Sequence, residues 1–102
     1  MKKIINGKMY NTETANRIAG WDNGLGSSDF RSVDETLYRK KTGEFFLHGI
    51  GGAMTRYARS CGENATCCGE GIVPLSIEEA KSWVEEHCRA ERYEEVFGVA
   101  EE

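Results

Sequence analysis

The sequence is poor in several features that would identify a functional class at once. It holds one proline and two histidines in 102 residues, and no apolar run approaches the roughly 18 residues of a membrane-spanning helix. Its 17 acidic residues outnumber 13 basic ones and give a net charge of −4. Nucleic-acid-binding domains need a basic footprint. We therefore expect no membrane association and no sequence-specific DNA binding, and we look for a protein partner with a basic surface.

Catalytic signatures are missing as well. No carboxylate pair, Ser-His-Asp set or nucleotide-binding fingerprint rises above background. The nearest approach to an acid–base pair is Glu35 with His48, which come close in the hairpin register described below. The sequence therefore predicts a protein without catalytic residues and without a cofactor.

The N-terminal third contains a turn signal followed by a helical pattern. Asn-Gly at positions 6–7 is the strongest two-residue hairpin signal, so residues 3–10 are expected to pair as two short strands. Three apolar residues then recur at helical spacing: Ala15, Ile18 and Ala19. This spacing predicts a helix over about 12–19, ended by Gly20.

The clearest strand signal is the stretch "ETLYRKKTGEFFLHG" at 35–49. Two runs rich in Leu, Tyr and Phe flank a three-residue loop with Gly43 in the left-handed position. The predicted register pairs Leu37 with Leu47 and Tyr38 with Phe46. Both faces are then partly apolar, so this hairpin should be central in its sheet.

The segment 49–71 holds many glycines and little periodicity, and we expect a long, mobile loop there. Residues 72–75 follow as a short edge strand, because they contain the proline. The motif Ser76-x-x-Glu79 is a capping box and predicts a helix over about 76–88. Its apolar stripe comprises Ile77, Ala80, Val84 and Cys88, with Trp83 and His87 beside it.

Together these elements predict one α+β domain over 1–102. A small antiparallel sheet with its central hairpin at about 35–49 packs against two helices, at about 12–19 and 76–88. The acidic tail, 90–102, is expected to be partly ordered, with Tyr93, Val96 and Phe97 packing back on the core.

The four cysteines are the main candidates for metal binding or redox chemistry. Structural zinc sites usually present C-x-x-C pairs, and the order Cys61, Cys67, Cys68, Cys88 lacks that spacing. Cys88 falls on the apolar stripe of the second helix, where a thiol acts as a small hydrophobe. We favour unligated thiols. A zinc site built on these four cysteines and a native disulfide both stay open as alternatives.

Two groups of residues are candidates for contacting a partner. The first combines cations with an aromatic ring in the glycine-rich segment: Arg56, Tyr57 and Arg59. The second is a set of carboxylates on the 76–88 helix, in pairs seven residues apart that should share its outward face: Glu78, Glu79, Glu85 and Glu86. Glu101 and Glu102 continue this acidity in the tail. A solvated loop and a solvated helix face are the plain alternatives.

Several stretches together resemble a known family. They are "MKKIINGKMYNTETA", "ETLYRKKTGEFFLHG" with "GGAMTRYA", and "IVPLSIEEAKSWVEEH" with "YEEVFG", which span nearly the whole chain. The chain resembles short proteins carried by phages, plasmids and conjugative elements of Firmicutes. Small acidic proteins of such elements include inhibitors of CRISPR–Cas effectors, so the resemblance implies an anti-CRISPR role. The family pattern lacks the cysteine-rich segment and transfers no catalytic residue to this chain.

These observations lead to two functional hypotheses. The first is a non-enzymatic inhibitor in the cytoplasm of a bacterial host. It would bind a CRISPR effector such as Cas9, or its guide-RNA complex, and block nucleic-acid loading or activation, since such effectors hold nucleic acid in positively charged channels. The second is a small metal- or redox-responsive regulator that uses the cysteine-rich segment. The cytoplasmic expectation rests on the start of the chain, Met1–Gly7, which is charged but lacks the apolar stretch of a signal peptide.

Overall fold

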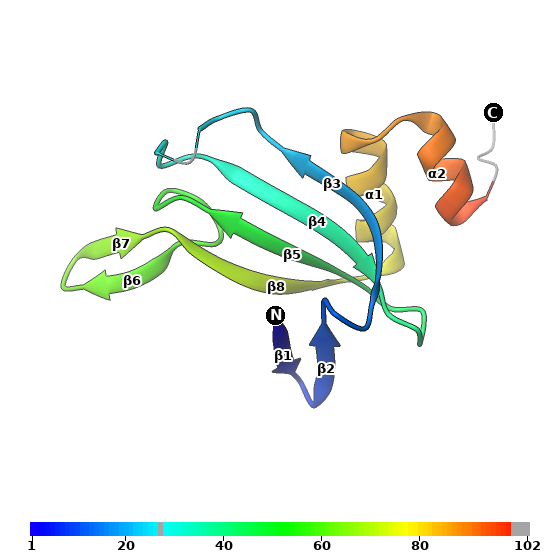
Figure 1. The fold of residues 1–102 in the computed structure, drawn as a ribbon, viewed down its shortest axis with the longest axis horizontal. Coiled ribbons are helices and arrows are strands. Elements are labelled where there is room, and N and C mark those ends of the chain that lie inside the picture. The colour runs from blue at the N-terminus through cyan, green and yellow to red at the C-terminus, as the bar shows by residue number, and fades with distance from the viewer. Residues whose placement is uncertain (27, 99–102) are drawn as a thin grey trace.

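The computed structural model describes residues 1–26 and 28–98. In chain order, its elements are β1 Lys2–Ile5, β2 Lys8–Asn11, β3 Asn16–Asp22, β4 Val33–Arg39, β5 Phe45–Gly51, β6 Arg59–Gly62, β7 Ala65–Cys67, β8 Gly69–Leu75, α1 Ile77–His87 and α2 Ala90–Phe97. A four-stranded antiparallel sheet in the order β3-β4-β5-β8 forms the centre, and β1–β2 and β6–β7 are separate hairpins (Figure 1). This antiparallel sheet packed with two helices confirms the predicted α+β class.

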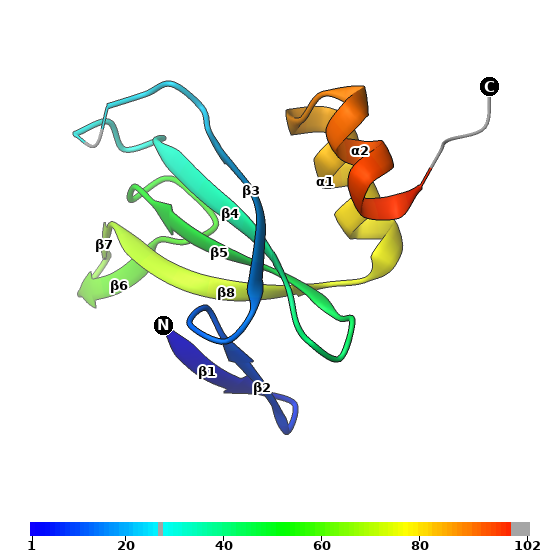
Figure 2. The same ribbon diagram turned by 45° about the vertical axis from the view of Figure 1, so that its right-hand side comes forward.

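The two faces of the central sheet are covered by different parts of the chain. The helices α1 and α2 pack on one face, over a core that includes Leu37, Leu47 and Val84. The β1–β2 hairpin packs on the other face, where Tyr10 meets Phe46 edge to face at 5.4 Å. The N-terminal hairpin accordingly lies apart from the helices in both views (Figures 1 and 2).

The central hairpin forms as its sequence predicts. Strands β4 and β5 are the two inner strands, and their register pairs Leu37 with Leu47 and Tyr38 with Phe46. The turn closes where the Lys40 N–H donates to the Glu44 carbonyl at 2.7 Å, with Gly43 at a φ of 97°. The Asn-Gly turn of β1–β2 is confirmed too, because both of its residues have positive φ.

The predicted helix over 12–19 is wrong. Residues 11–15 form a turn in which the Asn11 carbonyl accepts from the Ala15 N–H, and 16–22 form edge strand β3, paired with β4. A register shift between Arg17 and Ala19 interrupts the strand alternation. As a result the consecutive residues Ile18 and Ala19 both pack against the helix-side core. This irregularity produced an apolar spacing that resembles a helix.

The predicted loop over 49–71 is also mostly wrong. Its first residues complete β5, its last residues begin β8, and β6 and β7 form a hairpin between them. Residues 52–58, which we call the strap, are its longest part without strand structure. The short edge strand expected at 72–75 is the second half of the seven-residue edge strand β8.

The glycines of this region form a bare patch on one face of the sheet. Gly49 pairs with Gly71, and Gly51 with Gly69, across β5 and β8. The strap lies on the patch so closely that a Cβ on Gly49 would stand 1.9 Å from the Cζ atom of Tyr57. We call these four glycines the trough. Three of them, Gly49, Gly51 and Gly69, let the strap approach the sheet backbone, because a Cβ on each would lie 1.9–2.3 Å from a strap atom.

Both C-terminal segments are helical. The capping box of α1 is confirmed: the Glu79 N–H donates to the Ser76 hydroxyl at 3.1 Å, and the Ser76 N–H donates to the Glu79 carboxylate at 2.9 Å. Of the predicted stripe, Ala80 and Val84 are buried, whereas Ile77, the first residue of α1, is 51% exposed. Within the described part of the chain, no helix has the length and apolarity that a membrane crossing requires.

The first part of the tail is helical, because residues 90–97 form α2. Its apolar side chains pack against the core as expected: Tyr93, Val96 and Phe97. The ring of Phe97 lies 5.4 Å from that of Phe45 on β5. The last predicted acidic residues, Glu101 and Glu102, lie outside the described residues.

Gly49→Ala should displace the strap and lower the free energy of unfolding by roughly 2–4 kcal/mol, through overpacking and loss of a buried hydrogen bond. Gly71→Ala is the matched control. Its Cβ would meet Tyr57 Cδ1 at 3.8 Å, an ordinary contact, so we expect a change within about 0.5 kcal/mol. Urea unfolding followed by tryptophan fluorescence measures both, and equal losses would contradict the trough's role.

Candidate functional site

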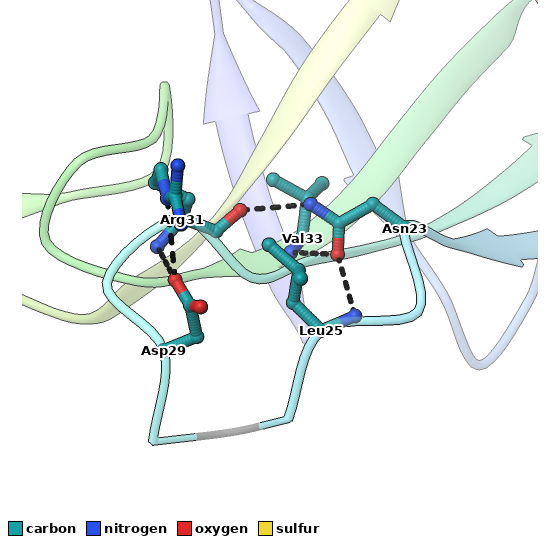
Figure 3. A network of polar contacts seen from close by, with 5 residues as sticks. All are labelled: Asn23, Leu25, Asp29, Arg31 and Val33. Carbon is teal, nitrogen blue, oxygen red and sulfur yellow. Dashed lines mark hydrogen bonds and ion pairs between the residues drawn. The ribbon is translucent and has the colours of Figure 1, made fainter.

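The loop between β3 and β4 is held in shape by a polar network (Figure 3). The side-chain amide of Asn23 donates to the Arg31 carbonyl at 2.8 Å, and its oxygen accepts from the Val33 N–H at 3.1 Å. Asp29 accepts from the Arg31 N–H at 2.8 Å and lies 3.6 Å from its guanidinium. Short polar side chains bonded to nearby backbone in this way define the shape of a loop.

This loop anchors the start of the strap. The Gly52 N–H donates to the Ser32 carbonyl at 2.9 Å, and the Met54 N–H donates to the Phe30 carbonyl at 2.8 Å. A Cβ on Gly52 would lie 2.4 Å from the Phe30 carbonyl oxygen, so only glycine permits this approach. The strap therefore leaves the loop in a fixed direction, which brings its residues 56 and 57 over the sheet.

The strap and α1 meet at a buried carboxylate on β4. Glu35 is only 5% exposed, and both of its oxygens are hydrogen-bonded. The Tyr57 hydroxyl donates to Oε2 at 2.5 Å, and the Trp83 indole N–H donates to Oε1 at 3.0 Å. The Arg56 guanidinium lies 3.9 Å from Oε2. These donors provide the hydrogen bonds and the positive charge that a buried carboxylate needs.

Tyr57 reaches Glu35 because the trough leaves room for its ring. Glu35 pairs with Gly49, and Gly49 with Gly71, so the three residues form one row across the sheet. Burial raises the pKa of the Tyr57 hydroxyl well above its ordinary value, and the hydrogen bond to the Glu35 carboxylate raises it further. Tyr57 therefore stays protonated and acts as a donor.

A groove of about 360 Å³ opens between the strap and α1. Its apolar lining comes from Leu47, Leu75 and Trp83, and its polar lining from Arg56, Glu78, Glu79, Ser82 and Glu86. Three carboxylates thus face one guanidinium around an apolar floor. Hydrogen bonds from Ser76, and more weakly the charge of Arg56, hold the pKa of Glu79 below its ordinary value. The groove is therefore acidic at neutral pH.

The structure brings four of the seven predicted contact residues into this groove: Arg56, Glu78, Glu79 and Glu86. The other three lie elsewhere. Tyr57 is 6% exposed and belongs to the interior, because its hydroxyl donates to the buried Glu35 carboxylate. Arg59 is on β6, where it donates to the Cys68 carbonyl. Glu85 lines a second hollow, on the α2 side of α1, although all four carboxylates of α1 are exposed.

The possible acid–base pair of Glu35 and His48 is not formed. His48 pairs with Thr36 and Glu35 with Gly49, so the two side chains project from opposite faces of the sheet. The His48 imidazole instead lies 2.8 Å from the Glu70 carboxylate. His48 is also distant from the free thiol of Cys68, which would need a base to act as a nucleophile. Cys68 precedes Ile72, the cross-strand partner of His48, by four residues. Four residues of a strand span about 13 Å.

The state of the cysteines differs from the unligated thiols that we expected from the sequence. Cys61 and Cys67 form a disulfide, with their Cα atoms 5.9 Å apart, while Cys68 and Cys88 are free. Unligated thiols are therefore wrong for the first pair, because the β6–β7 hairpin brings the two together. Cys88 packs against the core, and burial raises the pKa of its thiol. Across 1–26 and 28–98, no three His, Cys, Asp or Glu side chains form a metal-binding group.

The contact between Glu35 and Trp83 could not be predicted from the sequence. The sequence indicates Glu35 only as a partner of His48, and Trp83 only as an aromatic residue beside the helix stripe, because their contact spans 48 residues. One signal was present. The repeats Gly49-x-Gly51 and Gly69-x-Gly71 place glycines on one face of two neighbouring strands, where side chains are otherwise expected.

Comparison with known proteins provides no relative from which a function could be transferred. No family model, no curated protein and no solved structure matches the chain. Functional inference therefore rests on the groove and its surroundings.

Tyr57→Phe should lower the free energy of unfolding by about 1–3 kcal/mol at neutral pH, because Glu35 loses its closest donor. It should also reduce the alkaline loss of stability. Folding raises the pKa of Tyr57, so its contribution to the free energy of unfolding is complete below the unfolded-state pKa of about 10. Above that pKa the contribution falls, by up to about 1.4 kcal/mol per pH unit.

Urea unfolding between pH 8 and 11 measures both effects. Tyr38→Phe is the control, since that hydroxyl has no side-chain or backbone partner among the residues the structure describes. A parallel pH dependence in the wild type and Tyr57→Phe would show that the Tyr57 proton is not held by folding.

Proposed function

We propose that this chain is a non-enzymatic binding protein that places its acidic groove against a basic surface of a protein partner. The observation behind the proposal is the grouping of Glu78, Glu79 and Glu86 around an apolar floor. In agreement with the family resemblance, the partner we propose is a CRISPR effector such as Cas9, bound so that nucleic-acid loading or activation is blocked.

The chemistry of the groove suits a lysine or arginine side chain of the partner. The aliphatic stem of such a residue would lie along Leu75 and Trp83, and its charged head would meet Glu79 or Glu86. Charged hydrogen bonds of this kind are stronger than neutral ones, and they are strongest where the surroundings exclude water. An apolar floor beneath the carboxylates provides part of that exclusion.

Rigidity of the groove also supports a binding role. The floor residue Trp83 is 7% exposed and hydrogen-bonded to Glu35, so its position is fixed before a partner arrives. The carboxylates are on α1, whose first turn is closed by the capping box. A pre-organised surface binds with less loss of conformational entropy.

The effector hypothesis adds a reason for the sign of the charge. CRISPR effectors hold guide and target nucleic acid in positively charged channels. A small acidic protein would be attracted to such a channel and would compete with the nucleic acid there.

Replacing two groove carboxylates, in Glu78→Gln with Glu86→Gln, should weaken binding to a purified effector by about tenfold and reduce its salt dependence. The control pair, Glu85→Gln with Glu91→Gln, removes the same charge from exposed positions that do not line the groove. Titration calorimetry against several effector types, at two salt concentrations, measures the affinities.

A cleavage assay with guide RNA loaded before or after the protein then locates the blocked step. Protection is expected when the protein is added first. Equal losses of affinity in both variant pairs would mean that net charge, and not the groove, determines binding. Absence of binding to every effector would remove the CRISPR proposal.

A further inference from the structure

The β6–β7 hairpin is the least supported element of the fold. Every residue of β6 is exposed, and β7 contributes only the half-buried Cys67. Neither core cluster includes a residue of 59–67. An isolated two-stranded hairpin is marginally stable in water, so something other than burial must order this one.

The bond between Cys61 and Cys67 is the strongest constraint on the hairpin. It joins β6 to β7 across a sequence separation of 6. Two further contacts hold the hairpin to the rest of the fold: the Thr66 hydroxyl donates to the Ala53 carbonyl at 3.1 Å, and Arg59 Nε donates to the Cys68 carbonyl at 3.2 Å. Both side chains are on exposed residues, where single hydrogen bonds contribute little.

We propose that the base of this hairpin is a thiol–disulfide exchange site for a dithiol reductant, and that the Cys61–Cys67 bond is a reversible clip that orders β6–β7. Cys61 is exposed, and a free exposed thiol, Cys68, directly follows Cys67. Exposed disulfides are the ones that reductants open. Because the hairpin contributes nothing to the core, opening leaves the central sheet intact.

The exchange is balanced as follows. One thiolate of the dithiol attacks a sulfur of the pair, a mixed disulfide forms, and the other cysteine leaves as a thiolate. The second thiol of the reductant then attacks the mixed disulfide and releases the remaining cysteine. The protein gains two electrons and two protons, and the reductant ends as a cyclic disulfide.

The clip controls a surface separate from the acidic groove. Beside the hairpin base lies a hollow of about 460 Å³ lined by Ile50, Arg59, Cys68, Gly69 and Glu70. Reduction would release Arg59 from its fixed place there. Tyr57 stays in position, because Glu35 and the trough hold it independently of the disulfide. Redox state therefore changes this hollow and leaves the groove unchanged.

Thiol counting and hydrogen exchange test the proposal on the full chain. In protein purified without reductant, denatured samples should show two titratable thiols, Cys68 and Cys88, and all four cysteines after dithiothreitol. Exchange of the β6–β7 amides should accelerate about fiftyfold on reduction, the loss that loop-closure entropy implies for so short a loop. Amides of β5 should keep their protection.

Cys67→Ser should reproduce the reduced exchange pattern without reductant, whereas Cys88→Ser, which removes a thiol outside the hairpin, should not. Four thiols before reduction would show that the bond does not form and would overturn the proposal. So would a hairpin that keeps its protection after reduction. Loss of β5 protection together with that of the hairpin would show a bond needed by the whole fold, and would overturn its role as a local clip.

Discussion

The hydrogen bonding of one buried carboxylate determines how this fold is closed. Glu35 is in the middle of the helix-side face of the sheet, where an unpartnered charge would cost several kcal/mol. Its donors come from segments 22 and 48 residues away in the chain. Tyr57 reaches Glu35 only when the strap lies in the trough, and Trp83 reaches it only when α1 packs on the apolar half of the face. The packing of the strap and the packing of α1 are therefore coupled through Glu35.

The parts of the fold that the sequence predicts are those set by neighbouring residues. The β4–β5 register follows from the turn at Gly43, and the start of α1 follows from the capping box of Ser76 and Glu79. Both are local patterns that can be recognised in the sequence without the fold. Strand β3 could not be predicted, because a bulge at Ile18 gives its apolar residues a helical spacing. Four of the seven candidate contact residues meet in the groove, but the carboxylate beneath them becomes visible only through contacts between distant segments.

The interior and the surface of the site have separate tasks. Glu35, Tyr57 and Trp83 are buried, and Glu35 accepts a hydrogen bond from each of the other two, so these residues set the geometry of the site. The carboxylates above them are exposed and free to meet a cation. Trp83 both forms the floor of the groove and donates to Glu35. A substitution at Glu35 would therefore alter the groove without replacing any residue that a partner touches.

Strand β8 and strand β3 are the two edges of the central sheet, and each carries a feature that hinders pairing with a further strand. On β8, Pro74 offers no N–H to an incoming chain. On β3, the Arg92 guanidinium donates to the Ile18 carbonyl, which occupies an acceptor that a new strand would need. Sheet extension is thereby obstructed on both sides. In small strand-rich domains, features of this kind on the edge strands hinder edge-to-edge association between copies of the chain.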